Sequence, residues 1–209
     1  MSALEQLRRY LDECPLVAII RGVTPAEAEA IGEAMFEAGI RIIEVPLNSP
    51  DPLKSIEILA SKLGERALIG GGTVLKVDDV AKVRASGGRL IVSPNTNPDV
   101  IAAAVSEGLV SMPGFFTPSE AFRAIEAGAT ALKLFPAEGA APAILKAQLA
   151  VIPKQVPILI VGGVSPDNMR PWLEAGAAGF GLGSGLYKPG QSASDTAERA
   201  RAYLAGLRA

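Results

Sequence analysis

Short apolar runs alternate with longer segments of helical pattern along almost the whole chain. The helical segments end at a glycine, after which an apolar run begins; these endings are Ala38-Gly39, Leu63-Gly64, Ser86-Gly87, Glu107-Gly108, Ala127-Gly128 and Ala175-Gly176. Glycine directly after a helix is the usual left-handed cap. The endings recur roughly every 20 to 25 residues, with one double interval, which indicates an internal strand–helix repeat.

Eight of the apolar runs are predicted to be β-strands. They are Leu16–Gly22, Ile40–Leu47, Ala67–Val74, Leu90–Pro94, Leu109–Pro113, Ala131–Phe135, Ile158–Val164 and Gly179–Gly183. Several of the following helices are expected to begin with an N-cap residue and then Pro; the pairs are Thr24-Pro25, Ser49-Pro50, Asn97-Pro98, Thr117-Pro118 and Ser165-Pro166. The pattern therefore predicts an α/β fold, a (β/α)8 TIM barrel with an N-terminal helix, forming a single domain over residues 1–209. An open, doubly wound sheet is the alternative, although that fold seldom needs so regular a repeat.

Composition narrows the classes of function. The net charge is −2 and no basic run occurs, so nucleic-acid binding is not expected. No apolar segment has the length of a membrane span or the form of a signal peptide, and Cys14 is the only cysteine. A single cysteine cannot form an internal disulfide, which suits a reducing compartment. We therefore expect a soluble cytoplasmic protein.

The chain contains no histidine. This excludes histidine general bases, Ser–His nucleophiles and His-ligated metal sites, and we expect no metal. Proton transfer must then depend on Glu, Asp, Lys, Tyr or water.

Lys133 is the most unusual residue of the predicted strands. It lies between Leu132 and Leu134, which share one face and should pack on helices, so Lys133 should point into the barrel with Ala131 and Phe135. Desolvation there favours the neutral amine, which is the nucleophile that a Schiff base needs. Alternatively, its ammonium group reaches out to the barrel rim.

Three more polar side chains occur late in predicted strands. Glu44 shares the inward face with Ile42 and could exchange protons with a buried amine, or form a structural ion pair with Lys133 or Arg21. Arg21 ends the first strand and suits a carboxylate or phosphate, or else pairs with Glu44. Thr73 follows three glycines and could donate to a carboxylate, or cap the next helix.

Glycine-rich loops follow the last two predicted strands. Gly162 and Gly163 come where the seventh strand ends, and Gly183, Ser184 and Gly185 where the eighth ends. In (β/α)8 barrels these two loops often bind phosphate through backbone N–H groups. Tight turns in a small barrel are the alternative. Tyr187 and Lys188, which follow the second loop, could line the edge of the phosphate site, but we expect them on the surface.

These groups together allow aldol chemistry. The amine of Lys133 could attack the C2 carbonyl of a 2-keto acid, and the resulting imine would accept electrons as the C3–C4 bond breaks. Glu44 could move the protons, Arg21 and Thr73 could hold the carboxylate, and the glycine loops with Ser184 the phosphate.

The chain resembles the 2-keto-3-deoxy-6-phosphogluconate and 2-keto-3-deoxy-6-phosphogalactonate aldolases over nearly its whole length. The resemblance lies in the segments 19–23, 43–50, 69–75, 92–95, 132–136, 161–164 and 181–184. It implies Lys133 as the Schiff-base lysine, Glu44 as the proton-transfer residue, a homotrimer and no cofactor. It also implies pyruvate near Thr73, Phe135 and Gly162, and the phosphate near Gly163, Gly183 and Ser184.

One short sequence segment favours a resemblance to the phosphogalactonate branch of these aldolases. Phosphogluconate enzymes usually carry Leu-Arg-Thr shortly after the catalytic Glu, whereas this chain has Leu47-Asn48-Ser49, and it has Arg21 in the first strand. The expected reaction is therefore reversible cleavage of 2-dehydro-3-deoxy-6-phosphogalactonate to pyruvate and glyceraldehyde 3-phosphate. The alternatives are the phosphogluconate epimer or both epimers, a sugar-phosphate isomerase or epimerase, and a non-catalytic sugar-phosphate binder or structural trimer.

Overall fold

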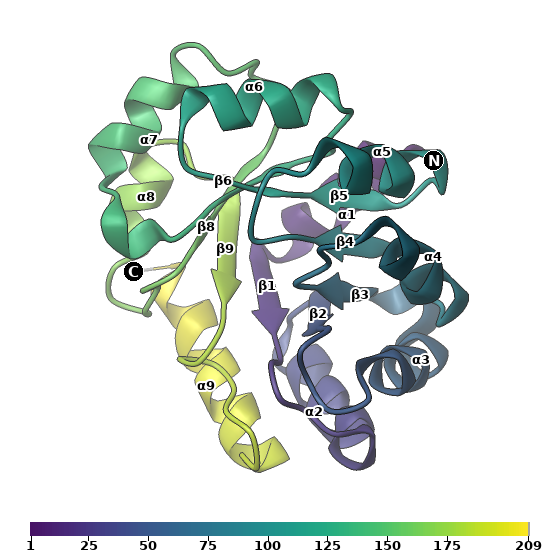
Figure 1. Cartoon of the computed structure of the whole chain (residues 1–209). Helices are drawn as coiled ribbons and strands as arrows, with labels where there is room; N and C mark the ends of the chain where they lie inside the picture. Colours follow the sequence, from purple (N-terminus) through teal and green to yellow (C-terminus); the bar gives the residue numbers. More distant parts are fainter. Residues whose placement is uncertain (209) are drawn as a thin grey trace.

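A computed structural model describes residues 1–208 and contains a barrel of parallel strands with helices around its outside (Figure 1). The strands are β1 Leu16–Ile19, β2 Ile42–Pro46, β3 Leu68–Gly72, β4 Leu90–Val92, β5 Val110–Met112, β6 Gly114–Phe115, β7 Leu132–Leu134, β8 Ile158–Val161 and β9 Gly179–Leu182. The α-helices are α1 Ala3–Glu13, α2 Pro25–Ala38, α3 Pro52–Leu63, α4 Val77–Ala85, α5 Pro98–Ser106, α6 Pro118–Glu126, α7 Pro142–Leu149, α8 Arg170–Glu174 and α9 Ala193–Gly206. Two 3₁₀ turns, η1 Gly64–Arg66 and η2 Ala137–Gly139, complete these elements.

The predicted fifth strand corresponds to β5, and an additional short strand, β6, follows it directly after Pro113. The sheet order is β5-β4-β3-β2-β1-β9-β8-β7-β6, so β5 pairs with β4 at one end and β6 with β7 at the other. Pro113 lies between them and has no N–H to donate, but its carbonyl accepts a hydrogen bond from Lys133 N at 2.9 Å. One stretch of chain thus joins both ends of the sheet, and the (β/α)8 prediction is confirmed.

Side chains of the strands alternate between two apolar clusters. The inner cluster contains Val17, Ile42, Leu68, Leu90, Val110, Ala131 and Leu159. The outer cluster, against the helices, contains Ala18, Ile43, Val45, Leu132 and Leu134. This confirms that Glu44 and Lys133 have the parity of the barrel interior, two residues beyond Ile42 and Ala131.

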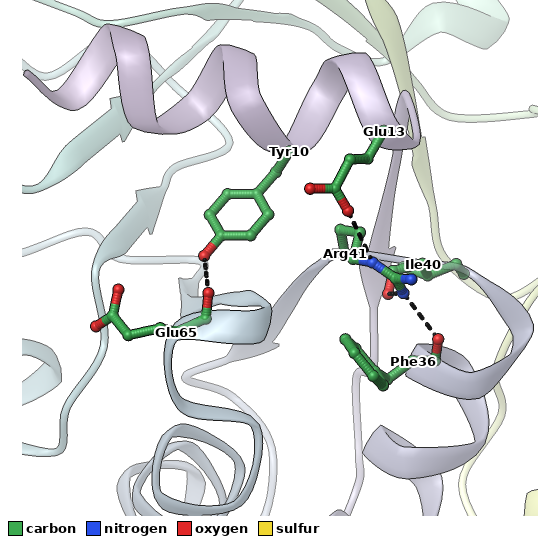
Figure 2. Close-up of polar contacts among 6 residues, drawn as sticks. All are labelled: Tyr10, Glu13, Phe36, Ile40, Arg41 and Glu65. Carbon is green, nitrogen blue, oxygen red and sulfur yellow. Dashed lines mark hydrogen bonds and ion pairs between the residues drawn. The ribbon is translucent and has the colours of Figure 1, made fainter. Parts of the chain in front are cut away.

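Helix α1 closes the N-terminal end of the barrel. Its Leu7, Tyr10 and Leu11 belong to the inner cluster, and Ser2 caps the helix with Glu5 at its third position. Figure 2 shows how polar contacts hold it: the Tyr10 hydroxyl donates to the Glu65 carbonyl at 2.6 Å, and Glu13 pairs with Arg41 at 3.1 Å.

Two of the five predicted helix starts are wrong. Helix α3 begins at Pro52, with Asp51 as N-cap, because Ser49 Oγ is used elsewhere and accepts from Gly22 N at 2.9 Å. Helix α8 begins at Arg170 instead of after Ser165, because Asn168 holds a turn. The Asn168 side chain accepts from Ser165 N at 2.9 Å and donates to the Gly163 carbonyl at 2.8 Å.

Within residues 1–208, no helix combines the length and the apolar character that crossing a membrane requires.

Candidate active site

A cavity of about 560 Å³ opens at the C-terminal ends of the strands. It is lined by Ile19, Arg21, Thr73, Pro94, Lys133, Phe135, Glu138, Val161, Gly162, Gly163, Val164, Gly181, Gly183, Ser184, Gly185, Tyr187, Lys188 and Pro189. Every predicted site residue except Glu44 lies on this wall. Residues that are up to 163 positions apart in the sequence thus meet where a (β/α)8 barrel carries its chemistry.

Lys133 stands on the middle residue of β7 and is only 7% exposed. Its neighbours across the sheet are Gly114 and Leu159, and its Nζ lies 4.8 Å from the centre of the Phe135 ring. Burial lowers the pKa of Lys133; the charge of Glu44 opposes this shift, and that of Arg21 adds to it. The arrangement favours a neutral, nucleophilic amine at the cavity wall.

Glu44 is 2% exposed, and its Oε2 atom is buried without a hydrogen-bond partner. Burial raises the pKa of this carboxyl to about 7, although the positive charges of Lys133 and Arg21 oppose the shift. A group with this pKa can both accept and donate a proton near neutral pH. Among residues 1–208, Glu44 has no ion pair within 4.0 Å, so the structure does not support the structural-pair alternative.

Gly72 makes room for the Glu44 carboxylate. A β-carbon at Gly72 would overlap Glu44 Oε2, so any side chain there would displace the acid. Gly72 is paired with Pro46 at the end of β2. The missing side chain of Gly72 thus lets the Glu44 carboxylate approach the backbone closely.

Arg21 and Thr73 lie together at the cavity rim, as predicted. Arg21 Nη1 donates to the Asn48 side-chain oxygen and to Thr73 Oγ1, the latter at 3.4 Å. Thr73 has a left-handed φ of 54°, and Lys76 is the N-cap of α4, so Thr73 does not cap that helix. Asn48 belongs to the segment Leu47-Asn48-Ser49, which distinguished the two branches of the resembling family in the sequence; in the structure it orients the Arg21 guanidinium.

The two glycine loops form another part of the wall. Gly162 and Gly163 have φ values of 110° and 65°, which L-residues with a side chain rarely adopt. A β-carbon at Gly183 would contact nothing within 4 Å, so the space beside it is open. Ser184 next to it is exposed.

The sequence left one residue of the wall unnoticed and gave the wrong exposure for another. Tyr187 was expected on the surface but is 2% exposed, with its buried hydroxyl unpaired. Lys188 is exposed as expected, yet it stands at the cavity rim beside the second glycine loop. Glu138, on η2, was not considered; the sequence shows it as an acidic residue shortly after Lys133 and gives no further sign of its position. Among residues 1–208, no three His, Cys, Asp or Glu side chains gather as a potential metal-binding group.

Comparison with known proteins identifies the family. Residues 7–200 match the family model described as KDPG and KHG aldolase. The chain is 47% identical to a 2-dehydro-3-deoxy-6-phosphogalactonate aldolase of Escherichia coli (strain K12) over 96% of its own length and 98% of the relative's. It is 50% identical to a probable enzyme of that name from Rhizobium meliloti (strain 1021), covering 92% and 91% of the two chains.

A solved structure agrees with these relatives. The structure described as native KDPGal superposes with a TM-score of 0.92 at 46% identity, over 94% of this chain and 95% of the other. Because the family model covers most of the chain and the relatives exceed 30% identity over nearly its full length, this chain belongs to the KDPG and KHG aldolase family and is an aldolase, a carbon–carbon lyase.

Proposed function

We propose that the chain reversibly cleaves 2-dehydro-3-deoxy-6-phosphogalactonate to pyruvate and glyceraldehyde 3-phosphate through a Schiff base on Lys133. One observation carries the proposal: a buried amine with a lowered pKa lines the cavity, and a buried carboxyl with a raised pKa lies within its electrostatic reach. Environments that shift the pKa values of an acid and a base toward neutral pH are typical of proton-transfer sites.

The chemistry follows from these two groups. Lys133 Nζ attacks the C2 carbonyl, and loss of water leaves a protonated imine. The C3–C4 bond then breaks as the C4 hydroxyl loses its proton, and the electron pair passes into an enamine while the aldehyde departs. Glu44 takes that proton and returns one to C3, and water hydrolyses the imine to release pyruvate. Every step uses groups of the chain and water, so no metal or cofactor is needed.

Several other wall residues bind the two ends of the substrate. Arg21 and Thr73 offer donors to the keto-acid carboxylate, and Phe135 and Gly162 border the pyruvate part. Gly163, Gly183 and Ser184 receive the phosphate, with open space at Gly183 and the cation of Lys188 nearby. Holding the phosphate away from the breaking bond orients that bond over Lys133 and Glu44.

The preference for the galactonate epimer rests on Asn48 and on the relatives. Asn48 takes the place where phosphogluconate enzymes usually carry Arg, and here it binds Arg21. The two curated relatives described above both carry the phosphogalactonate name. The phosphogluconate epimer is the second candidate, since the two substrates differ only in configuration at C4.

Two measurements test the proposal. Pyruvate with borohydride should add a stable adduct to Lys133, located by peptide mass spectrometry; an unmodified Lys133 at saturating pyruvate would overturn the mechanism. Pyruvate release from each epimer should then be faster for the phosphogalactonate. Turnover that persists in Lys133→Ala would favour an isomerase or epimerase, and ligand binding without turnover a non-catalytic binder.

We infer that the enzyme is a cytoplasmic homotrimer. Exposed Phe116, Phe122, Ile144 and Val151 form part of the outer surface around α6 and α7, and contact with another copy would remove their apolar area from water. The lone, reduced Cys14 supports a reducing compartment. Light scattering should give three times the 21.6 kDa chain mass, and a monomer would contradict the trimer.

A further inference from the structure

Glu138 is an acidic residue of the cavity wall that the proposed mechanism does not use. It lies on η2, directly after the segment Phe135-Pro136 that follows β7, and its neighbour Ala137 is buried and fixes the turn. Its side chain reaches the cavity and is exposed there. An ionised carboxylate can only accept hydrogen bonds, so its position determines which substrate group it can meet.

The glycines of the first loop make space for this carboxylate. A β-carbon at Gly162 would overlap Glu138 Oε2 and lie 2.9 Å from its Cδ; at Gly163 it would lie 2.7 Å from Glu138 Cγ. Both glycines therefore leave room for the Glu138 side chain. Because Gly162 and Gly163 have no side chains, the Glu138 carboxylate can lie against this loop, although the backbone N–H groups of such a loop also suit anions.

The Glu138 carboxylate is unpaired in the described chain. Across residues 1–208, its side chain is in no hydrogen bond and in no ion pair within 4.0 Å, whereas Glu29, Glu33 and Glu57 on α2 and α3 each pair with a lysine. Its acceptor sites are consequently free to meet a donor that enters the cavity.

The order of the strands places Glu138 between the two reacting ends. Strands β7, β8 and β9 are neighbours, and they carry in turn Lys133, the Gly162-Gly163 loop and the loop of Ser184 and Lys188. Glu138 lies over the middle of this row. A substrate that joins Lys133 at C2 and reaches Ser184 with its phosphate must pass Glu138 with the carbons in between.

We propose that Glu138 accepts a hydrogen bond from the C5 hydroxyl, which is the hydroxyl next to the carbonyl in the three-carbon aldehyde phosphate. This inference rests on the proposed function. A phosphate dianion would be repelled by the carboxylate, and the C4 hydroxyl gives its proton to Glu44, so the C5 hydroxyl is the remaining donor in this part of the substrate. Glu138 is thus a specificity residue for the hydroxylated aldehyde and takes no part in breaking the bond.

The test compares two aldehydes in the condensation with pyruvate: D-glyceraldehyde 3-phosphate and 3-oxopropyl phosphate, which lacks only the hydroxyl. Glu138→Ala should lower kcat/KM for the hydroxylated aldehyde by about 10- to 100-fold, because hydrogen bonds to charged groups are strong. For 3-oxopropyl phosphate the change should stay below about 3-fold. Glu138→Gln keeps an acceptor without charge and should fall in between.

Glu198→Ala, which removes an exposed acid of α9 outside the cavity, is the matched control and should leave both rates unchanged. Equal losses for the two aldehydes, or no loss, or a gain from relieved repulsion of the phosphate, would each overturn the role of Glu138. Borohydride trapping of pyruvate should be the same in wild type and Glu138→Ala. A wild-type chain that traps no pyruvate would overturn the proposed function instead.

Discussion

The two ends of the barrel interior differ in composition although the same strands form both. At the N-terminal end, α1 inserts Leu7, Tyr10 and Leu11 into an apolar layer. At the C-terminal end, the inward positions two residues later carry Glu44 and Lys133 beneath an open cavity. The first end stabilises the fold, because it removes apolar surface from water. The second end destabilises the fold, because two ionisable groups are buried there away from water.

Strand β2 contains this difference within three residues. Ile42 is completely buried in the inner cluster, and Glu44 on the same face has a carboxyl oxygen without a partner. Along one inward face of a strand, a residue near the N-terminal end therefore packs in the core, and a residue near the C-terminal end is available for chemistry. Substitutions at the two ends should therefore separate activity from stability.

The largest expected effect is on activity at the cavity end. Lys133→Met should lower kcat for cleavage by more than about 1000-fold, because the covalent route through the imine is lost. Its free energy of unfolding should not fall, since an apolar chain of similar length replaces a buried amine. Lys146→Met, at an exposed site on α7, is the control for the substitution itself. Equal losses in both variants would contradict the functional reading of the cavity end.

The next effect is on stability at the closed end. Leu7→Ala should lower the free energy of unfolding by about 2–4 kcal/mol, because it opens a hole in the fully buried layer between α1 and the strands. Urea denaturation measures the loss. The kcat of the folded fraction should stay within about 2-fold of wild type. A large fall in kcat without loss of stability would show that α1 acts on the chemistry and would break the comparison.

A pH-dependent effect should appear at Glu44. Its pKa rises from 4.5 to about 7 on folding, so the folded state binds a proton that the unfolded state has released between these values. Wild-type stability should therefore decrease as pH rises from 4.5 to 7, by at most about 3 kcal/mol. Glu44→Gln should remove this decrease and be more stable than wild type at pH 8, while it loses activity. Equal stability curves from pH 4.5 to 8 would contradict the shifted pKa.

The smallest effect concerns the cavity rim. Asn48→Ala removes an acceptor of the Arg21 guanidinium and should raise the KM for the keto acid by about 3- to 10-fold, with little change in kcat. Initial rates at several substrate concentrations separate the two constants. A change confined to kcat would place Asn48 in the chemical step instead of in orientation.

The fold and the inward positions of Glu44 and Lys133 could be predicted because their signals are local. Alternation along a strand fixes which face a residue occupies, so a charge between leucines, as at Lys133, is visible without knowing its neighbours. Thr73 and Arg21 could be found for a similar reason, since the ends of parallel strands meet at one rim.

The missed features depend on contacts between distant segments. Glu138 lies in a short turn with no apolar periodicity, and its place against Gly162 depends on how β7 and β8 lie side by side. The misplaced start of α3 arises because Ser49 bonds to Gly22, which the sequence between them does not indicate. The break at Pro113 likewise reflects pairing with two different neighbouring strands.

Helix α1 also determines how small molecules move in the proposed reaction. Because it seals one end of the barrel with the apolar layer of the strands, substrate and products would share the cavity at the other end. Ser184 and Lys188 are exposed, whereas Lys133 is buried, so the proposed reaction would hold the aldehyde phosphate on the outer side and the pyruvate unit deeper. Release is then sequential: the three-carbon phosphate leaves first, and only afterwards can water reach the imine and free the keto acid.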